Sequence, residues 1–391
     1  MAVAVLLAML AVLTGMLYSH INSTELPGEM FEDIVARSLR YGCTATRHEV
    51  TTSDGYILSL FRIQSPFQPV ASPPVLFLHG VGVNGDQFAL NLHTKPIAYR
   101  LVEEGCDVWI ANMRGTPYSE GHSQGLSPDM PEYWDWTAEE LVERDLKAIL
   151  AEVETVTRKK VVIVGHSQGG MVGMAYLAMF PAENAKISLL ITIACPGAKN
   201  SNETWLFKLF LHPFTHSFFS LIGKFHFFRR SQSLLPAKLL TRFPSIAYYY
   251  VRSRYDPRLN GDMEDKGGVY AYRLAGGTSL KNLQYFGQHV GAEDPRPMRF
   301  DYGEEENWLH YNSSSPPLLD YAQITTPLAF LGGKHDLLVK PSDLEALISI
   351  FPADKVVFTK LDYNHDHGSF ALSKNQEHVN DIIRLIKQYG Q

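Results

Sequence analysis

The sequence predicts an α/β fold in which a mostly parallel central sheet is covered by helices on both faces. The main observation is that short apolar runs alternate with helical patterns along most of the chain. A chain of 391 residues, 45% of them hydrophobic, is also long enough for one large domain with an insertion. Continuous apolar runs are typical of strands that are buried on both faces. The predicted strands are residues 56–63, 75–78, 107–111, 161–164, 188–194, 327–332 and 355–360.

Three helix starts are predicted from capping boxes, in which a hydroxyl accepts a backbone N–H and an acid or amide three residues later reaches back. These pairs are Thr137 with Glu140, Ser342 with Glu345 and Ser373 with Gln376. The last is expected to open a helix whose apolar residues share one face at a spacing of about 3.6 residues. These residues are Val379, Ile382, Ile383 and Ile386.

The alternation of strands and helices lapses in one region, which defines the predicted domain organisation. We expect a core at residues 28–200 and 319–391, interrupted by an insertion at 201–318. Within the insertion, residues 205–228 crowd Trp, Phe and Leu at mixed spacing between basic residues. One interpretation is an ordinary packed helical subdomain, and a second is a cap whose apolar surface meets a lipid substrate over a pocket. The two interpretations are compatible.

Charge and cysteine content exclude several classes of protein. The chain has 41 acidic and 35 basic residues, a formal net charge of −6, and no basic block, so nothing indicates nucleic-acid binding. The three cysteines, Cys43, Cys106 and Cys195, are too few and too scattered for a disulfide framework or a zinc site. At most one disulfide can form.

The first 20 residues are predicted to be a signal peptide or a retained signal-anchor. Residues 1–17 are apolar, but no Lys or Arg precedes them and no clear Ala-x-Ala cleavage site follows, so both readings stay open. Asn22, Asn202 and Asn312 begin N-glycosylation sequons, which agrees with export. We therefore expect a protein of the secretory pathway.

The pentapeptide Gly-His-Ser-Gln-Gly occurs twice, at residues 121–125 and 165–169. This motif supplies a nucleophile only where a buried strand runs into a tight turn that exposes the serine and a helix starts directly behind it. Prolines flank the first copy where a strand and a helix are needed, so Ser123 is predicted to be a loop residue. A buried strand precedes the second copy and a helical pattern follows it. Ser167 is therefore the predicted nucleophile.

A serine nucleophile needs a base and an acid that orients the base, and in this arrangement the acid and then the histidine follow the serine along the chain. Asp336 lies in the loop after a late predicted strand. His365 and His367 lie in the loop after the next one, and either could be the base. The alternative readings are a solvated carboxylate at Asp336 or a metal site formed by the histidines with Asp336 and Asp366. Nothing else in the sequence supports a metal.

An oxyanion needs backbone N–H donors beside the nucleophile. Residues 76–84 read as a strand followed by His79-Gly80, the form expected for the loop that supplies one donor. The predicted donors are the N–H groups of Val81 and Gln168. A simple turn after a strand is the alternative reading of His79-Gly80.

Taken together, these motifs resemble the acid lipases, the gastric and lysosomal lipase-like branch of the α/β-hydrolases with plant and protist relatives. The resemblance runs from about residue 28 to the C-terminus, except for the insertion. The motifs are HEVTTSDGYILSLFRI (48–63), FLHGV (77–81), CDVWIANMRGTPYSEGH (106–122), LSPDMPEYWDW (126–136), GHSQGG (165–170), GGKHDLL (332–338) and YNH (363–365). The resemblance implies an α/β-hydrolase fold with an inserted cap or lid, and no catalytic residue in the loop that holds the first pentapeptide.

The resemblance also assigns the base, because the family's Tyr-Asn-His motif falls on His365. Relatives usually continue His-x-Asp-Phe, whereas this chain reads His365-Asp-His-Gly-Ser-Phe370, and an alignment on His-x-x-Phe would choose His367 instead. Animal members often carry cysteines in the lid, and here no cysteine follows Cys195. Lid architecture is thus the part that the resemblance carries over least well.

The predicted function is hydrolysis of neutral lipid esters, triacylglycerol or steryl ester, through an acyl-enzyme on Ser167, with Asp336 and His365 completing the triad. No cofactor is required, and the expected partner is a lipid–water interface, with the cap in contact with a membrane or lipid droplet. The expected location is secreted, lysosomal or vacuolar. Two alternatives remain, a carboxylesterase or acyltransferase of smaller soluble esters and a non-catalytic binding protein built on the same fold.

Overall fold

The central sheet is formed by nine strands within residues 14–67, 72–197, 226–243, 266–289, 294 and 296–390, which the computed structural model describes. All seven predicted strands are confirmed, and two further strands, β1 and β5, join them. The strands are β1 (Thr44–Thr51), β2 (Tyr56–Gln64), β3 (Pro74–Leu78), β4 (Asp107–Asn112), β5 (Gly121–His122), β6 (Val161–His166), β7 (Ile187–Ile193), β10 (Leu328–Gly333) and β11 (Val356–Tyr363).

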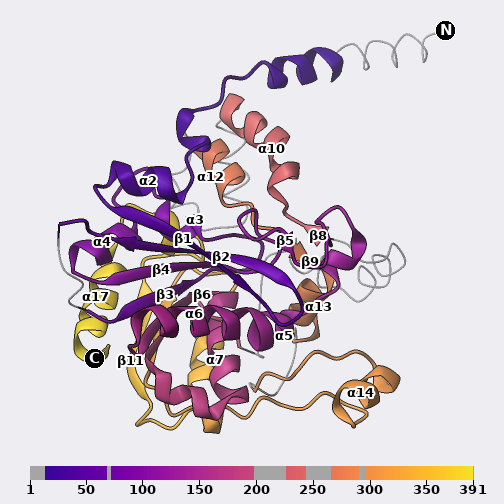
Figure 1. Ribbon diagram of the computed structural model, residues 1–391, viewed down its shortest axis with the longest axis vertical. Helices are drawn as coiled ribbons and strands as arrows, with labels where there is room; N and C mark the ends of the chain where they lie inside the picture. Colours follow the sequence, from indigo (N-terminus) through magenta and orange to yellow (C-terminus); the bar gives the residue numbers. More distant parts are fainter. Residues whose placement is uncertain are drawn as a thin grey trace.

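The strand order is β1-β2-β4-β3-β6-β7-β10-β11, with β5 paired to β2. The pairs β1–β2 and β2–β4 are antiparallel, and every pair from β4 to β11 is parallel. The predicted α/β fold with a mostly parallel sheet is thereby confirmed (Figure 1). The carboxyl ends of the parallel strands meet at one edge, where ligands bind in such sheets.

Helices cover both faces of the sheet. One face carries α2 (Ile34–Arg40), α4 (Ile97–Glu103) and α17 (Glu377–Tyr389), and the other carries α6 (Lys147–Thr157), α7 (Gln168–Met179) and α15 (Pro341–Ile348). Successive strand residues point to opposite faces. In β3, Leu76 belongs to the core under α7, and its neighbours Val75 and Phe77 belong to the core under α4.

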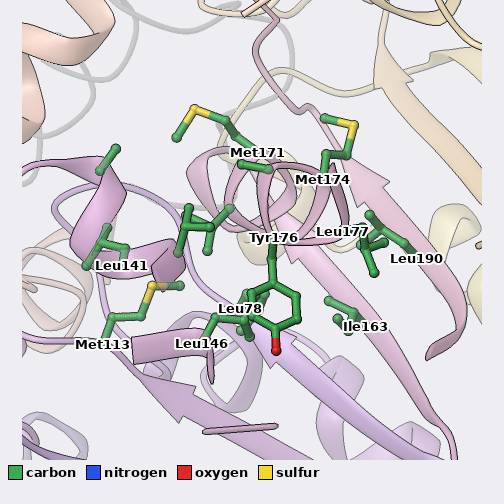
Figure 2. Packing of buried hydrophobic residues seen from close by; sticks show 14 of the residues in the cluster. Leu78, Met113, Leu141, Leu146, Ile163, Met171, Met174, Tyr176, Leu177 and Leu190 are labelled. Carbon is green, nitrogen blue, oxygen red and sulfur yellow. The ribbon is translucent and has the colours of Figure 1, made fainter. Parts of the chain in front are cut away.

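Helix α7 lies against the centre of the sheet. Figure 2 shows its Met171, Met174 and Leu177 among side chains of β3, β6 and β7. All its residues from Gln168 to Ala178 are buried, so the helix that begins at the second pentapeptide is one of the best-packed elements of the core.

The capping predictions had mixed outcomes. Thr137 forms the full capping box with Glu140 at α5 (Ala138–Glu140), which a π-helical turn, Leu141–Leu146, follows. The prediction for Ser342 is wrong, because α15 begins at Pro341 and the serine lies inside the helix. The prediction for Ser373 is also wrong, since α17 begins only at Glu377.

The C-terminal helix nevertheless buries the predicted face. Val379, Ile382 and Ile386 are at most 1% exposed, and Ile383 is half-buried. At the start of α17, the Asn375 Oδ1 accepts the Glu377 N–H at 3.1 Å, while the Ser373 Oγ accepts the Asn375 N–H at 3.0 Å. The side chain that binds the first N–H of this helix is therefore that of Asn375, and not that of Ser373 as the sequence pattern predicted.

The described residues between β7 and β10 lie outside the main sheet. The described elements of the insertion are β8 (His226–Phe227), α10 (Arg230–Arg242), α12 (Gly267–Arg273), β9 (Thr278–Ser279), α13 (Leu280–Gln288) and α14 (Glu304–Tyr311). β8 pairs with β9 outside the main sheet, and α10 packs against α12 (Figure 1). Most of the aromatic run 205–228 lies outside the described residues. The exact limits of the insertion stay a prediction.

Short elements complete the fold. They are α3 (Asp86–Ala89), α16 (Ser369–Leu372) and the 3-10 turns Gly28–Met30, Pro131–Trp134, Pro181–Lys186 and Tyr321–Gln323.

The N-terminal segment is described from residue 14 onward, and residues 14–22 are helical. Among the helices that can be described, none is long and apolar enough to cross a membrane. Asn22 and Asn312 are exposed, and Asn202 lies outside the described residues. The three cysteines are buried and unpaired, so none of them forms a disulfide.

Candidate active site

The second pentapeptide forms a sharp turn between β6 and α7. Ser167 has φ 53° and ψ −123°, a conformation that is costly for a residue with a side chain. Its N–H donates to the Ile193 carbonyl of β7 at 2.8 Å, which ties the strained turn to the sheet. The predicted strand, turn and helix are therefore all present at Ser167.

Both glycines of this pentapeptide are required by close backbone contacts. A Cβ on Gly165 would lie 2.4 Å from the Gly170 nitrogen, and a Cβ on Gly169 would lie 2.1 Å from the Leu78 carbonyl oxygen. Each distance is far below van der Waals contact. Only glycine lets β6, the turn and α7 approach one another and β3 so closely.

The first pentapeptide lies elsewhere and has a different conformation. Ser123 is exposed in a turn directly after β5, and its N–H donates to the Gly55 carbonyl at 2.7 Å. Gly125 has φ +81°, but a Cβ there would meet nothing within 4 Å. The prediction that Ser123 is a loop residue is confirmed.

Asp336 and His367 form a buried pair in the loops after β10 and β11. The His367 Nδ1 donates to the Asp336 Oδ2 at 2.8 Å. The other carboxylate oxygen accepts the N–H groups of Leu338 and Val339, at 2.8 and 2.9 Å. Since Asp336 is only 2% exposed and all these partners are donors, the carboxylate is fixed in position as an acceptor for the imidazole.

His365, the base that the resemblance assigned, is not brought to Asp336. Its ring is fully buried, its Nε2 lies 2.9 Å from the His378 Nδ1, and the Phe370 ring packs edge-on against it. Its carbonyl accepts the His335 N–H at 3.1 Å, so the residue helps to build the loop that carries Asp336. The geometry therefore favours the alternative base, His367, and corrects the assignment to His365.

The electrostatic environments of the two histidines differ accordingly. Burial lowers the pKa of His365 below its ordinary value. Burial also opposes protonation of His367, but the Asp336 carboxylate outweighs it and raises the pKa of that imidazole. His367 is thus the histidine whose imidazolium form is stabilised, as a base must be once it has accepted a proton.

His166, the residue before Ser167, contacts the loop that carries His367. Its Nε2 lies 3.1 Å from the His367 carbonyl oxygen and must donate, because a carbonyl can only accept. Burial lowers the pKa of His166 well below its ordinary value, so the ring is neutral. His166 therefore links the turn at Ser167 to the loop of His367.

The two predicted oxyanion donors belong to segments that adjoin Ser167. Gln168 begins α7 immediately after the nucleophile, and Val81 follows Gly80, whose Cβ, if present, would lie 3.3 Å from the Ser167 Cβ. The Gly80 N–H donates to the Gln87 Oε1 at 3.2 Å, and this bond fixes the loop before Val81. The loop after β3 thus closely approaches the nucleophile.

A pocket of about 210 Å³ opens beside the nucleophile. Ser167, His367, Gly80 and Val81 line it together with mostly apolar side chains. The apolar lining residues are Val83, Pro196, Leu274, Phe286, Leu338, Val339, Ala371 and Leu372. Across the part of the chain that the structure describes, no group of His, Cys, Asp and Glu residues is arranged to hold a metal ion.

Comparison with known proteins identifies the family. The chain matches the family described as "alpha/beta hydrolase fold" over residues 73–371, and "Partial alpha/beta-hydrolase lipase region" over residues 35–92. The chain belongs to the alpha/beta hydrolase fold family. The lipase region of the second match confirms the resemblance to the acid lipases that the motifs predict.

Several relatives align along almost the whole chain. It is 28% identical over 375 residues to human lipase member K, covering 90% of both chains. It is 28% identical to mouse gastric triacylglycerol lipase, covering 89% of this chain and 90% of the relative, and 26% identical to triacylglycerol lipase 1 of Arabidopsis thaliana, covering 97% and 96%. The prediction of a carboxylic ester hydrolase is confirmed by these matches.

Solved structures support the fold. A putative lipase from Acinetobacter baumannii superposes with a TM-score of 0.55 at 13% identity, covering 94% of this chain and 99% of that chain. A putative aryl esterase from Burkholderia cenocepacia gives 0.53 at 14% identity, covering 88% and 99%.

Sequence reasoning missed four residues that shape the site, namely Gln87, His166, Asn282 and His378. His166 stands inside the motif itself, so its position next to the nucleophile was a readable signal. The other three act through side-chain contacts, over 7 residues for Gln87, 13 for His378 and 114 for Asn282, for which no capping or periodicity rule exists.

Proposed function

We propose that this protein hydrolyses esters of neutral lipids through a triad of Ser167, His367 and Asp336. The observation that carries the proposal is the 2.8 Å bond from His367 to Asp336 beside a pocket that Ser167 and His367 line together. Because Asp336 binds Nδ1, the Nε2 atom of the base is left for the nucleophile.

In the first half of the reaction, the Ser167 Oγ attacks the ester carbonyl carbon and the His367 Nε2 takes the hydroxyl proton. The carbonyl oxygen becomes an oxyanion, which the N–H groups of Val81 and Gln168 stabilise. The carbon–oxygen bond to the alcohol then breaks. His367 returns its proton to the departing alkoxide, and the acyl group remains on Ser167.

In the second half, water attacks the acyl carbon and gives a proton to His367. The bond from the acyl carbon to the Ser167 Oγ breaks, the fatty acid leaves, and the serine recovers the proton from His367. The Asp336 carboxylate stabilises the imidazolium that forms twice in each cycle.

The apolar lining of the pocket supports a long acyl chain as the substrate group, since nine of its residues are apolar or aromatic counting Val81. The names of the relatives, which include triacylglycerol lipases, support triacylglycerol as the substrate class. Steryl ester is a further candidate. We further propose that the protein acts at a lipid–water interface, with the insertion as a cap. The proposal also includes passage through the secretory pathway to the outside of the cell or to a lysosome or vacuole.

The test compares fatty acid release from emulsified long-chain triacylglycerol and from a soluble short-chain ester. We expect the emulsion to be preferred and Ser167→Ala to abolish both activities. If only the soluble ester is cleaved, the proposed triad stands, but the proposed lipase activity is wrong and the alternative, a carboxylesterase or acyltransferase, is favoured.

A further inference from the structure

A buried pair of side-chain amides joins the nucleophile turn to the insertion. The Asn282 Nδ2 of α13 donates to the Gln168 Oε1 at 3.1 Å, and the Gln168 Nε2 donates back to the Asn282 Oδ1 at 3.4 Å. The two residues are 1% and 3% exposed. Gln168 thus has its main chain beside the nucleophile and its side chain bound to the insertion.

Asn282 is itself fixed within the insertion. Its Nδ2 also donates to the Thr278 Oγ1 at 2.8 Å, and its backbone N–H donates at 3.0 Å to the Ser279 Oγ, which caps α13. Ser279 in turn donates to the Trp136 carbonyl of the core. The amide that reaches Gln168 is therefore held by neighbours that restrict its rotation.

The same stretch of the insertion also binds the loop of the other oxyanion donor. The Asn84 Nδ2 donates to the carbonyls of Arg273 and Ala275 at 2.7 and 3.0 Å. The Gly276 N–H donates to the Gly82 carbonyl at 3.0 Å, and a Cβ on Gly276 would lie 1.9 Å from the Val83 oxygen. Residues 273–282 are thus attached to both donor segments, to the residues directly after Val81 and to Gln168 itself.

We propose that Asn282 is a positioning residue for the oxyanion donor Gln168. This inference rests on the proposed function. Gln168 is the first residue of α7, so the orientation of its N–H depends on the first turn of that helix. The amide pair holds that turn at the angle at which the N–H points to the developing oxyanion. Electrostatic stabilisation of this kind requires donors that are already oriented before charge develops.

The test is Asn282→Leu, which removes both hydrogen bonds at similar side-chain volume. We expect kcat to fall about 10-fold while KM stays within about twofold, because an oxyanion donor acts in the transition state and not on the bound substrate. Affinity for an alkylboronic acid, which mimics the tetrahedral intermediate, should fall by the same factor. Affinity for the fatty acid product should be unchanged.

Asn307→Leu is the matched control. Asn307 is another buried asparagine of the insertion, on α14, and its amide binds Tyr302, Asp301 and Ser314 at 2.7–3.1 Å. This variant should lose comparable thermal stability, since it also leaves buried polar partners unpaired, but keep kcat. A fall in kcat that is equal in the two variants would overturn the inference, as would a change in KM alone.

Two further variants test the pair itself. Leucine at position 168 keeps the backbone N–H, so Gln168→Leu should lower kcat by the same factor as Asn282→Leu, and the double variant should lower it by no more than either. Fully additive losses would overturn the inference. Asn282→Ala removes both hydrogen bonds without a bulky side chain and should lose kcat to the same extent, which covers the case that the leucine variant does not fold. Activity remaining in Ser167→Ala would instead refute the proposed function itself.

Discussion

The two Gly-His-Ser-Gln-Gly stretches have the same five residues and different structures. At Ser167 the backbone takes φ 53° between β6 and α7, and the side chain faces a pocket with His367. In the first stretch, Gly121 and His122 form the two-residue strand β5, and Ser123 is exposed in the turn that follows. The comparison shows that the pentapeptide permits the nucleophile turn but does not produce it.

The difference lies in the neighbours of each stretch. Val161–His166 is buried at every position, and the helix that follows is buried along one side of the sheet, so packing can sustain the strained serine. The first copy has no comparable core around it. A strained backbone at a serine therefore indicates a nucleophile only where the surrounding packing stabilises that conformation.

The largest expected difference separates the two serines directly. Ser167→Ala should reduce kcat by about 10⁶-fold, as loss of a triad nucleophile does. Ser123→Ala should stay within about twofold of wild type, because an exposed loop hydroxyl contributes little. Fatty acid release by both purified variants, each shown to be folded by circular dichroism, checks the pair.

The two histidines give the next largest contrast. His367→Asn should lower kcat by about 10⁵-fold, because the base is removed. His365→Asn should keep kcat within about threefold but lower the free energy of unfolding by about 1–3 kcal/mol, since His378 loses its buried partner. Kinetics and thermal denaturation of both variants measure this contrast, and the reverse pattern would restore His365 as the base.

Asp336→Asn should reduce kcat about 10⁴-fold and shift its pH dependence. Asp336 raises the pKa of His367, and the base must be neutral to act, so wild-type kcat/KM should fall as the pH drops through that raised pKa. Without the Asp336 carboxylate, burial lowers the pKa of the imidazole and only the weaker influence of Asp366 opposes it. The acidic limb should then move to lower pH, and a limb that stays in place would contradict the pairing.

The glycines of the two stretches give the smallest effect, on stability. Gly169→Ala places a Cβ 2.1 Å from the Leu78 oxygen and should lower the free energy of unfolding by about 3 kcal/mol. At Gly125 an added Cβ has no neighbour within 4 Å. Gly125→Ala should therefore lower the free energy of unfolding by about 1 kcal/mol, because of the positive φ alone. Equal unfolding free energies from denaturant titration would show that the turn at Ser167 relaxes more than its contacts indicate.

Much of the fold could be predicted because its signals are local. Each buried parallel strand is a continuous apolar run, and the pentapeptide with a strand before it marks the nucleophile turn. β1 escaped prediction because it is an edge strand with the sequence TATRHEVT and no buried residue. The prediction of a helix start at Ser373 failed because its hydroxyl binds the N–H of Asn375, which lies before the helix. A serine that makes such a local hydrogen bond cannot be told from a helix cap by its sequence spacing.

The site was predictable only in part, because two of its features depend on distant contacts. His365 and His367 are two residues apart in one loop, and only the position of Asp336 after β10 distinguishes them. The pairing of Gln168 with Asn282 joins residues 114 positions apart, in a region without strand and helix alternation. No periodicity or capping rule encodes such a contact.

The central claim, that Ser167 is activated by His367, is tested most directly by labelling with a fluorophosphonate and locating the modified residue by mass spectrometry. We predict modification of Ser167 in the wild type and in His365→Asn at similar rates, and loss of labelling in His367→Asn. Modification of Ser123, or a labelling rate that depends on His365 and not on His367, would contradict the account.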